Sequence, residues 1–302
     1  MRVFATFPGE NWILDRISQD FRTYKPDIAT NNLVKADILW LLDGYSWRRL
    51  PVDFLKTKKI VLSVHHVTPK KFNLQDFVNR DELVDLYHVP CKQTHDFIKK
   101  YTSKPIKVVG YWYNPELWQP LNKNECRKLF DLKENEFVVG SFQRDTEGHD
   151  LKTPKLEKGP DLFCDYVEKL NENKNVHVLL GGWRRQYVIS RLNKASIKYT
   201  YKEMAPLDEI QKMYGACDLY VVSSRFEGGP QAVLEAPSMK VPIVSTSVGM
   251  APDVLTEKCI INVENEIYFP SEEDVNNNFE NVKEFAIQKQ IEKYEKMFRE
   301  MK

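Results

Sequence analysis

Short, nearly continuous apolar runs recur along the chain, and polar or amphipathic segments separate them. In the amino-terminal third these runs cover residues 2–7, 37–42, 59–64, 85–89 and 106–109, and later ones cover residues 137–140, 176–180, 197–199, 219–222 and 243–245. Runs this short and this apolar are typical of strands that are buried on both faces of a parallel sheet. The pattern therefore predicts an α/β protein in which strands and helices alternate.

Several of the intervening segments carry apolar residues at helical spacing. The first helix is expected to begin near Trp12, with Ile13, Ile17 and Phe21 on its apolar face. Further helices are expected in a segment that ends at residue 97, and over residues 160–170, 186–193, 207–214 and 275–302. Such spacing gives a helix one apolar face, which can pack on a sheet.

The length of 302 residues favours two domains over one. Residues 110–120 are aromatic, contain prolines and show no periodicity, which is typical of a linker. We therefore expect a Rossmann-like domain over residues 1–109, a linker over 110–120, a second Rossmann-like domain over 121–270 and a helical tail over 271–302.

The net charge of +1 argues against a dedicated nucleic-acid-binding protein, which would carry a strong basic excess. The charge is unevenly spread, because residues 1–110 hold 18 lysines and arginines against 12 acidic residues. A cluster of Trp47, Arg48 and Arg49 with nearby lysines (Lys56, Lys58 and Lys59) is compatible with a peripheral contact to an anionic membrane. Ordinary solvated surface charge is the alternative.

Five cysteines, widely spaced and without a Cys-x-x-Cys motif, fit reduced thiols and speak against a zinc site or a disulfide framework. Charged residues interrupt the amino-terminal apolar run, so it does not resemble a signal peptide. We expect a cytoplasmic protein that is at most peripheral to a membrane.

The most informative motif is SRFEGGPQAVLEA, which occupies residues 224–236 and follows the apolar run 219–222. A glycine-rich turn between a strand and a helix exposes backbone N–H groups and a positive helix end, which suit an anionic ligand. The carboxylates Glu227 and Glu235 would repel phosphates, but each can accept hydrogen bonds from two hydroxyl groups. Phosphates beside hydroxyl groups describe a nucleotide sugar.

This motif, with VPIVSTSVG at residues 241–249 and PDVL at residues 252–255, resembles the donor half of the family 4 retaining glycosyltransferases of the GT-B fold. The resemblance extends from about residue 138 to residue 255. Pro237 and Lys240 depart from it, because they replace a helix former and a glycine, and a short or kinked helix is expected there. The resemblance implies two Rossmann-like domains facing a cleft, with residues 1–109 on the acceptor side. It also implies that the carboxyl-terminal helix crosses back to the amino-terminal domain.

The resemblance assigns roles to several residues of the donor domain. Glu227 is expected to bind hydroxyls of the transferred sugar, Glu235 the ribose, and Gly228 and Gly229 the sugar or phosphate through backbone N–H groups. Arg144 and Lys158 match the cations that such enzymes place on the donor pyrophosphate, where positive charge stabilises the leaving group. Lys152 and Lys155 are alternatives to Lys158 in the same polar loop. Arg184 and Arg185, which follow another strand, are either further phosphate ligands or surface charge.

Two residues of the amino-terminal domain complete the expected site. Gly9 matches a glycine loop near the phosphates, and His66 is expected to face the donor sugar as a catalytic residue. Strand alternation favours His66 over its neighbour His65, and a structural histidine is the alternative for either.

No metal or other cofactor is expected, because Asp145-Thr146-Glu147 is a poor match to a metal-binding Asp-x-Asp motif and is interpreted as a solvated loop. The expected function is that of a retaining, metal-independent glycosyltransferase. It would move a hexose-type sugar from a nucleotide diphosphate sugar to a hydroxyl of a glycan, a lipid-linked molecule or a small molecule. A nucleotide-sugar epimerase or hydrolase of the same fold and a catalytically inactive nucleotide-sugar-binding subunit are the alternatives.

Overall fold

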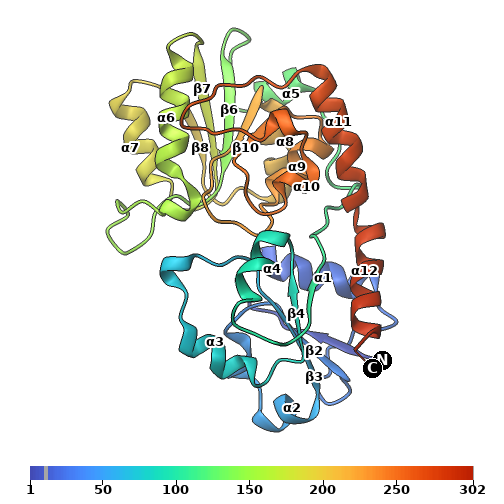
Figure 1. Cartoon of the computed structure of the whole chain (residues 1–302). Helices are drawn as coiled ribbons and strands as arrows, with labels where there is room; N and C mark the ends of the chain where they lie inside the picture. Colours follow the sequence, from blue (N-terminus) through green and yellow to red (C-terminus); the bar gives the residue numbers. More distant parts are fainter. Residues whose placement is uncertain (10–12, 302) are drawn as a thin grey trace. The chain divides into compact units, whose positions relative to one another are not determined.

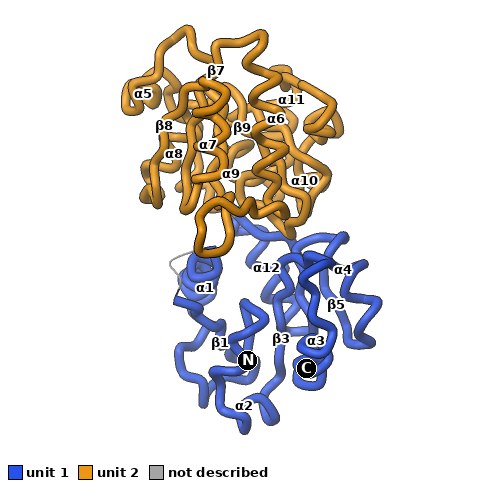
Figure 2. The backbone as a smooth tube through the Cα atoms, turned by 90° about the vertical axis from the view of Figure 1, so that its left-hand side faces the viewer, with its two compact units in different colours: residues 1–112, 286–302 blue, residues 113–285 orange. Residues whose placement is uncertain are grey.

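The computed structural model describes residues 1–9 and 13–301, which form two compact units (Figure 2). Unit 1 comprises Met1–Trp112 and Ala286–Lys302, and unit 2 comprises Tyr113–Phe285. The division falls within the aromatic segment 110–120, in which four side chains are buried: Tyr111, Trp112, Tyr113 and Trp118. These rings pack into the folded units, so this segment is not a solvent-exposed tether.

Unit 1 contains a five-stranded parallel sheet whose strand order follows the chain. Its strands are β1 (Val3–Ala5), β2 (Ile38–Leu41), β3 (Lys59–Ser63), β4 (Leu86–Val89) and β5 (Ile106–Val108). A parallel bridge joins Val3 to Ala29, and because Val3 also pairs with Ile38 of β2, Ala29 lies on the opposite side of β1. Ala29 therefore adds one parallel bridge to the free edge of β1.

The helices of unit 1 are α1 (Ile13–Tyr24), α2 (Val52–Thr57), α3 (Leu74–Asp81), α4 (Lys92–Ile98) and α12 (Ile287–Arg299), with 3-10 turns η1 (Ser46–Arg49) and η2 (Pro69–Lys71) (Figure 1). The first helix is confirmed from Ile13 onward, while Trp12 lies outside the described residues. Leu39 and Leu41 of β2 join an apolar cluster that includes Leu55 of α2 and Phe77 of α3. Trp40, between them, points to the other face, where it meets α1 and α12.

The carboxyl-terminal helix α12 packs on unit 1, as predicted. Trp40 of β2 lies 5.3 Å, between ring centroids, from both Tyr294 and Phe298 of this helix, and all three side chains are fully buried. Burying one large apolar side chain stabilises a fold by roughly 1.5–3 kcal/mol. Lys25, just after α1, forms ion pairs with Glu292 and Glu295 of α12. Aromatic packing and this charged contact together attach the helix to the sheet.

Unit 2 contains a second five-stranded parallel sheet, in the order β10-β9-β6-β7-β8. Its strands are β6 (Phe137–Phe142), β7 (Val176–Gly181), β8 (Lys198–Lys202), β9 (Leu219–Val222) and β10 (Ile243–Ser245). Its helices are α5 (Lys123–Lys128), α6 (Pro160–Asn171), α7 (Gln186–Lys194), α8 (Leu207–Ala216), α9 (Ala232–Ser238), α10 (Ala251–Val254) and α11 (Glu272–Val282). The 3-10 turns η3 (Leu156–Lys158), η4 (Glu257–Cys259) and η5 (Lys283–Phe285) complete the unit.

The strand order of unit 2 reverses between β6 and β9. From β6 the chain proceeds to β7 and β8 on one side, and it then returns to place β9 and β10 on the other. Helices α6 and α7 consequently cover one face of the sheet, and α8 and α9 lie on the other (Figure 1). This is the doubly wound arrangement, and the point of reversal between β6 and β9 is its switch point.

Every strand predicted from the sequence is present, and the predicted α/β class is confirmed. The expected short helix after the Gly-Gly-Pro turn is α9, which has seven residues and contains Pro237. The tail predicted as one helical stretch is interrupted at η5, between α11 and α12. Within the described part of the chain, no helix has both the length and the apolar character needed to cross a membrane.

Candidate active site

The loops that follow β6, β9 and β10 meet at the carboxyl ends of these strands. Gln143, just after β6, donates from Nε2 to the carbonyl of Lys158 over 3.0 Å and accepts from the Ser224 hydroxyl at 3.4 Å. The hydroxyl of Thr246, just after β10, donates to the carbonyl of Ser224 at 2.5 Å. Ligands of open parallel sheets bind beyond the carboxyl ends of the strands at the switch point, which makes this the candidate site.

Lys158 and Glu227 contact each other at this site. The Lys158 ammonium donates to Oε1 of Glu227, and the two side chains are 20% and 10% exposed. The Ser224 hydroxyl also donates to the same carboxylate oxygen at 3.4 Å. The structure thus brings together one cation and one carboxylate that the sequence predicted separately, 69 positions apart.

Backbone contacts fix the turn that carries Lys158. Gly159 adopts φ +59°, and a Cβ atom at this position would lie 1.9 Å from the carbonyl oxygen of Ser223. The Ser223 hydroxyl donates to the Gly159 carbonyl at 2.8 Å, and the N–H groups of Arg225 and Phe226 donate to the carbonyl of Glu157 at 2.8 and 3.1 Å. Only glycine permits this approach, so Gly159 sets how closely Lys158 can lie to the β9 loop.

The Gly-Gly-Pro turn lies directly after Glu227. Gly228 is buried and Gly229 is half-buried. Gly249, at φ +55°, packs against this turn, because a Cβ atom there would lie 2.3 Å from the Gly228 carbonyl oxygen. The assignment of the Gly228 and Gly229 N–H groups to a donor stays a prediction.

Glu235 lies on α9 and is 6% exposed. The Tyr214 hydroxyl donates to its Oε2 at 3.1 Å. The alternative of a helix-surface carboxylate is therefore wrong, while the predicted ribose contact stays a prediction.

Arg144 is half-buried in the loop after β6. Its Nε donates to the Thr146 carbonyl at 2.7 Å, and its guanidinium lies 5.1 Å from the centre of the Trp183 ring. Burial lowers the pKa of Arg144, and the neighbouring charge of Arg184 lowers it further. The described contacts of Arg144 do not include Lys158 or Glu227, and its role at a phosphate stays a prediction.

The loop Asp145-Thr146-Glu147 is not the solvated segment that the sequence suggested. Asp145 and Thr146 are 1% and 0% exposed, and Oδ2 of Asp145 pairs with Nε of Arg185 at 2.9 Å. Burial raises the pKa of Asp145, and the Arg185 charge opposes that shift. Arg185 also donates to the carbonyl of Gly181 at 2.8 Å and is 1% exposed. It is a structural residue, so both interpretations offered for it, phosphate ligand and surface charge, are wrong.

Gly9 and His66 lie in unit 1, after β1 and β3. Gly9 adopts φ +78°, and its N–H donates to Oδ1 of Asp15 at 2.9 Å. His66 is exposed, whereas His65 is hydrogen bonded through both ring nitrogens, to the Tyr111 hydroxyl and the Leu42 carbonyl. Burial lowers the pKa of His65 to about 4, so its ring is neutral near pH 7. His65 is the structural histidine of the pair, and the catalytic role of His66 stays a prediction.

Gln143 and Ser224 were missed in the sequence. Both are polar residues that follow a buried strand within two positions, and that placement is the signal that could have identified them.

Lys155, an alternative to Lys158, lies 3.9 Å from the Glu157 carboxylate, measured from Nζ to Oε1. Among residues 1–9 and 13–301 no cluster of three or more His, Cys, Asp or Glu side chains could hold a metal ion.

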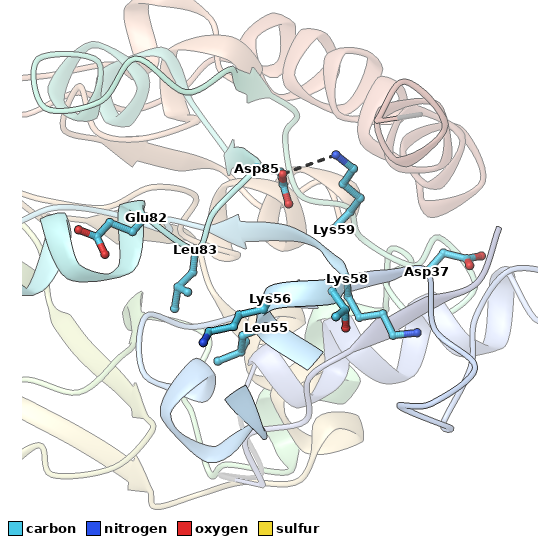
Figure 3. Close-up of a pocket in the computed structure, with 9 residues that line it drawn as sticks. Asp37, Leu55, Lys56, Lys58, Lys59, Glu82, Leu83 and Asp85 are labelled. Carbon is cyan, nitrogen blue, oxygen red and sulfur yellow. Dashed lines mark ion pairs between the residues drawn. The ribbon is translucent and has the colours of Figure 1, made fainter. Parts of the chain in front are cut away.

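A hollow of about 540 Å³ lies in unit 1, away from the carboxyl ends of its strands (Figure 3). Three lysines and three acidic residues contribute to its lining: Lys56, Lys58, Lys59, Asp37, Glu82 and Asp85. Lys59 begins β3, while Asp37 and Asp85 directly precede β2 and β4, so the hollow lies at the amino ends of the strands. We do not assign it to the donor, because open α/β sheets bind ligands at the other edge.

The chain is similar to known glycosyltransferases. The profile of the family described as "Glycosyl transferases group 1" matches residues 151–285. The chain is 26% identical over 165 residues to the lipopolysaccharide core biosynthesis mannosyltransferase LpsB of Rhizobium meliloti (strain 1021) and 21% identical over 164 residues to the O-antigen biosynthesis glycosyltransferase WclY of Escherichia coli. These alignments cover 52% and 50% of this chain but only 44% and 43% of the relatives, so the matched part spans less than half of each relative.

Among solved structures, Alr3699/HepE of Anabaena in complex with UDP and glucose superposes with a TM-score of 0.76 over 99% of both chains. The sequence identity is 12%, so this similarity shows the fold. The two parallel sheets, α12 packed on unit 1 and this superposition show that the chain has the GT-B fold, and the match over residues 151–285 shows that unit 2 is similar to the group 1 glycosyltransferases.

Proposed function

We propose that this protein is a glycosyltransferase that moves a sugar from a nucleotide diphosphate sugar to an acceptor hydroxyl. The contact between Lys158 and Glu227, beside the Gly228 turn at the switch point, carries the proposal. It places a cation that suits phosphate next to a carboxylate that suits sugar hydroxyls. The group 1 match over this region and the UDP complex of the HepE structure support a nucleotide sugar as the donor.

A bound donor would replace the contact between Lys158 and Glu227 with new partners for both side chains. The Lys158 ammonium would donate to phosphate oxygens, and sugar hydroxyls would donate to the Glu227 carboxylate. Because both side chains are largely buried, leaving either charge without a partner would be costly, and only a ligand with both groups satisfies the two together.

The proposed chemistry retains the configuration of the anomeric carbon. The bond from that carbon to the β-phosphate oxygen breaks, the acceptor oxygen attacks from the same face, and its proton passes to the leaving phosphate. Lys158 and Arg144 stabilise the negative charge that grows on the diphosphate, a task for which we propose that no metal ion is required. Removing one such donor typically costs about 3 kcal/mol of transition-state stabilisation.

A thermal-shift screen against UDP-, GDP- and ADP-linked hexoses tests the proposal, because a ligand that binds the native state raises its apparent stability. A ligand at 100 times its Kd adds about 2.7 kcal/mol. We expect one donor class to raise the midpoint for the wild type and not for Lys158→Ala or Glu227→Ala. Lys212→Ala is the matched control, because it removes an exposed lysine–carboxylate pair on α8. The proposal fails if no nucleotide sugar shifts the wild type.

Three further measurements test the chemistry once a donor is known. NMR of the product should show retention, and activity should survive a chelator. Inversion, or loss of activity that manganese restores, would contradict the proposed mechanism. Rapid turnover of the donor without an acceptor would favour a hydrolase or an epimerase.

We propose that the acceptor is a glycan, a lipid-linked molecule or a small molecule, and that Gly9 and His66 of unit 1 contribute to the reaction.

The basic residues of unit 1 are proposed to contact an anionic membrane, although Arg48 pairs with Asp76 and Lys59 lies 3.7 Å from Asp85. Sedimentation with liposomes tests this contact, and binding that does not depend on anionic lipid would exclude it.

A further inference from the structure

Trp183 lies in the loop after β7, and its ring contacts Arg144 of the loop after β6. Its ring centre lies 5.1 Å from the guanidinium carbon of Arg144 and 5.2 Å from that of Arg184, and the side chain is 47% exposed. The negative face of an indole attracts a guanidinium at this distance. We propose that Trp183 is a positioning residue that holds Arg144 for the diphosphate of a nucleotide ligand, an inference that rests on the proposed function.

The two loops that carry Trp183 and Arg144 are joined by buried contacts. The Arg184 carbonyl accepts from the Asp145 N–H at 3.2 Å and from the Thr146 hydroxyl at 3.1 Å. Asp145, the residue after Arg144, forms an ion pair with Arg185, two positions after Trp183, and both side chains of this pair are 1% exposed. These bonds join the residues that directly follow Arg144 and Trp183, so the two loops that carry the ring and the guanidinium are held next to each other.

The charge distribution points to an anionic ligand. Four of the six arginines in unit 2 form ion pairs with carboxylates, namely Arg127, Arg185, Arg191 and Arg225. Arg144 and Arg184, the two that lie over Trp183, form no ion pair with a carboxylate among residues 1–9 and 13–301. Arg184 is 9% exposed, donates one Nη2 bond to the Gly148 carbonyl and leaves its Nε without a partner in the described structure.

Glu147 and Glu157 act on Arg144 through their charges, but neither forms an ion pair with it in the described residues, and two neighbouring guanidiniums without such a pair favour a ligand that brings negative charge. The charge of Arg184 repels the Arg144 guanidinium, and attraction to the Trp183 ring opposes that repulsion. A guanidinium already held in place loses less conformational entropy when it binds phosphate. The chemical class that fits is a nucleoside diphosphate, whose phosphates can take the remaining N–H donors of Arg144.

Isothermal titration calorimetry with UDP, GDP and ADP tests the inference, using whichever of the three binds the wild type most tightly. We expect Arg144→Ala to weaken binding roughly 10- to 150-fold, the range for hydrogen bonds to charged groups. Trp183→Ala should weaken it about 3- to 30-fold, the range for a cation–π contact, and Trp183→Phe should restore most of that loss. The unfolding midpoint of the ligand-free protein should not change in either Trp183 variant.

Phe269→Ala is the matched control, because Phe269 is also half-exposed and lies 5.2 Å from the Lys174 ammonium, next to Phe137 at the start of β6. It should leave the affinity unchanged. Failure of the wild type to bind any of the three nucleotides would overturn the proposed function and the inference together. Weak binding by Arg144→Ala with wild-type affinity in Trp183→Ala would overturn the inference alone.

Discussion

Replacing Gly159 with alanine should disrupt the turn that carries Lys158. Gly159 has φ +59° and ψ 42°, and the added Cβ atom would lie 1.9 Å from the Ser223 carbonyl oxygen and 2.8 Å from its carbon. Real Cβ contacts essentially never fall below 3.0 Å, so the backbone of one loop must move by about 1 Å. The left-handed conformation costs alanine roughly 1–2 kcal/mol, and overpacking adds about 1–3 kcal/mol.

Alanine also restricts the unfolded chain, which offsets roughly 0.4–1 kcal/mol of this cost. We therefore expect Gly159→Ala to lower the free energy of unfolding of unit 2 by about 2–4 kcal/mol. Gly148→Ala is the matched control, since Gly148 has φ +74° but the nearest atom to an added Cβ would be 3.5 Å away. It carries only the conformational strain, and its net cost should be about 1 kcal/mol or less.

Urea unfolding followed by tryptophan fluorescence measures both variants, with buried Trp118 as a reporter inside unit 2. The m-value should stay constant if stability alone changes. Gly159→Ala should also lose the stabilisation that a nucleotide sugar gives the wild type, because displacing this turn separates Lys158 from Glu227. Equal stabilities of Gly159→Ala and Gly148→Ala would refute the claim that close backbone approach, rather than strain, requires this glycine.

Three other changes have defined outcomes. Lys25→Met removes the contact with two α12 carboxylates and should destabilise unit 1 by roughly 1–2 kcal/mol in urea unfolding, and no loss would show that aromatic packing alone holds the helix. Arg185→Met leaves the buried Asp145 carboxylate unpaired and should cost about 3–5 kcal/mol of unfolding free energy, whereas adding Asp145→Asn should recover part of it. Burial lowers the pKa of His65 to about 4 and the pKa of His88 to about 3. Between pH 6.5 and pH 4 the unfolded chain therefore binds more protons at these two histidines than the folded protein does, and the free energy of unfolding falls as the pH falls. At pH 4 each histidine should lower the free energy of unfolding of unit 1 by on the order of 3 kcal/mol, and a pH dependence of stability that His88→Gln leaves unchanged would contradict this.

The sequence predicted the strands well because each is a short apolar run buried on both faces. Strand β9 (Leu219–Val222) and strand β10 (Ile243–Ser245) have the bounds that the apolar pattern gives. The short helices α2, α3 and α5 were not predicted, since with six to eight residues each they complete only about two turns, too few to show a period. Local periodicity therefore reveals the longer elements with one apolar face and misses the shortest helices, even where they contribute a side chain to the core.

The candidate site was predicted in part. Lys158 and Glu227 were both identified, but their mutual contact depends on how the Gly159 turn docks on the β9 loop, which no local pattern encodes. Asp145 and Arg185 look like solvent-exposed charges in sequence, and their burial follows from a pairing across two adjacent loops. Contacts between loops that are distant in sequence are the part of the site that required the structure.

A crystal structure of the protein with a bound nucleotide diphosphate sugar would locate the donor. We expect the diphosphate at the carboxyl ends of β6 and β9, with the Lys158 ammonium on a phosphate oxygen and the Glu227 carboxylate on a sugar hydroxyl. Density for the nucleotide in the unit 1 hollow of Figure 3, or a bound donor that leaves the contact between Lys158 and Glu227 intact, would contradict it.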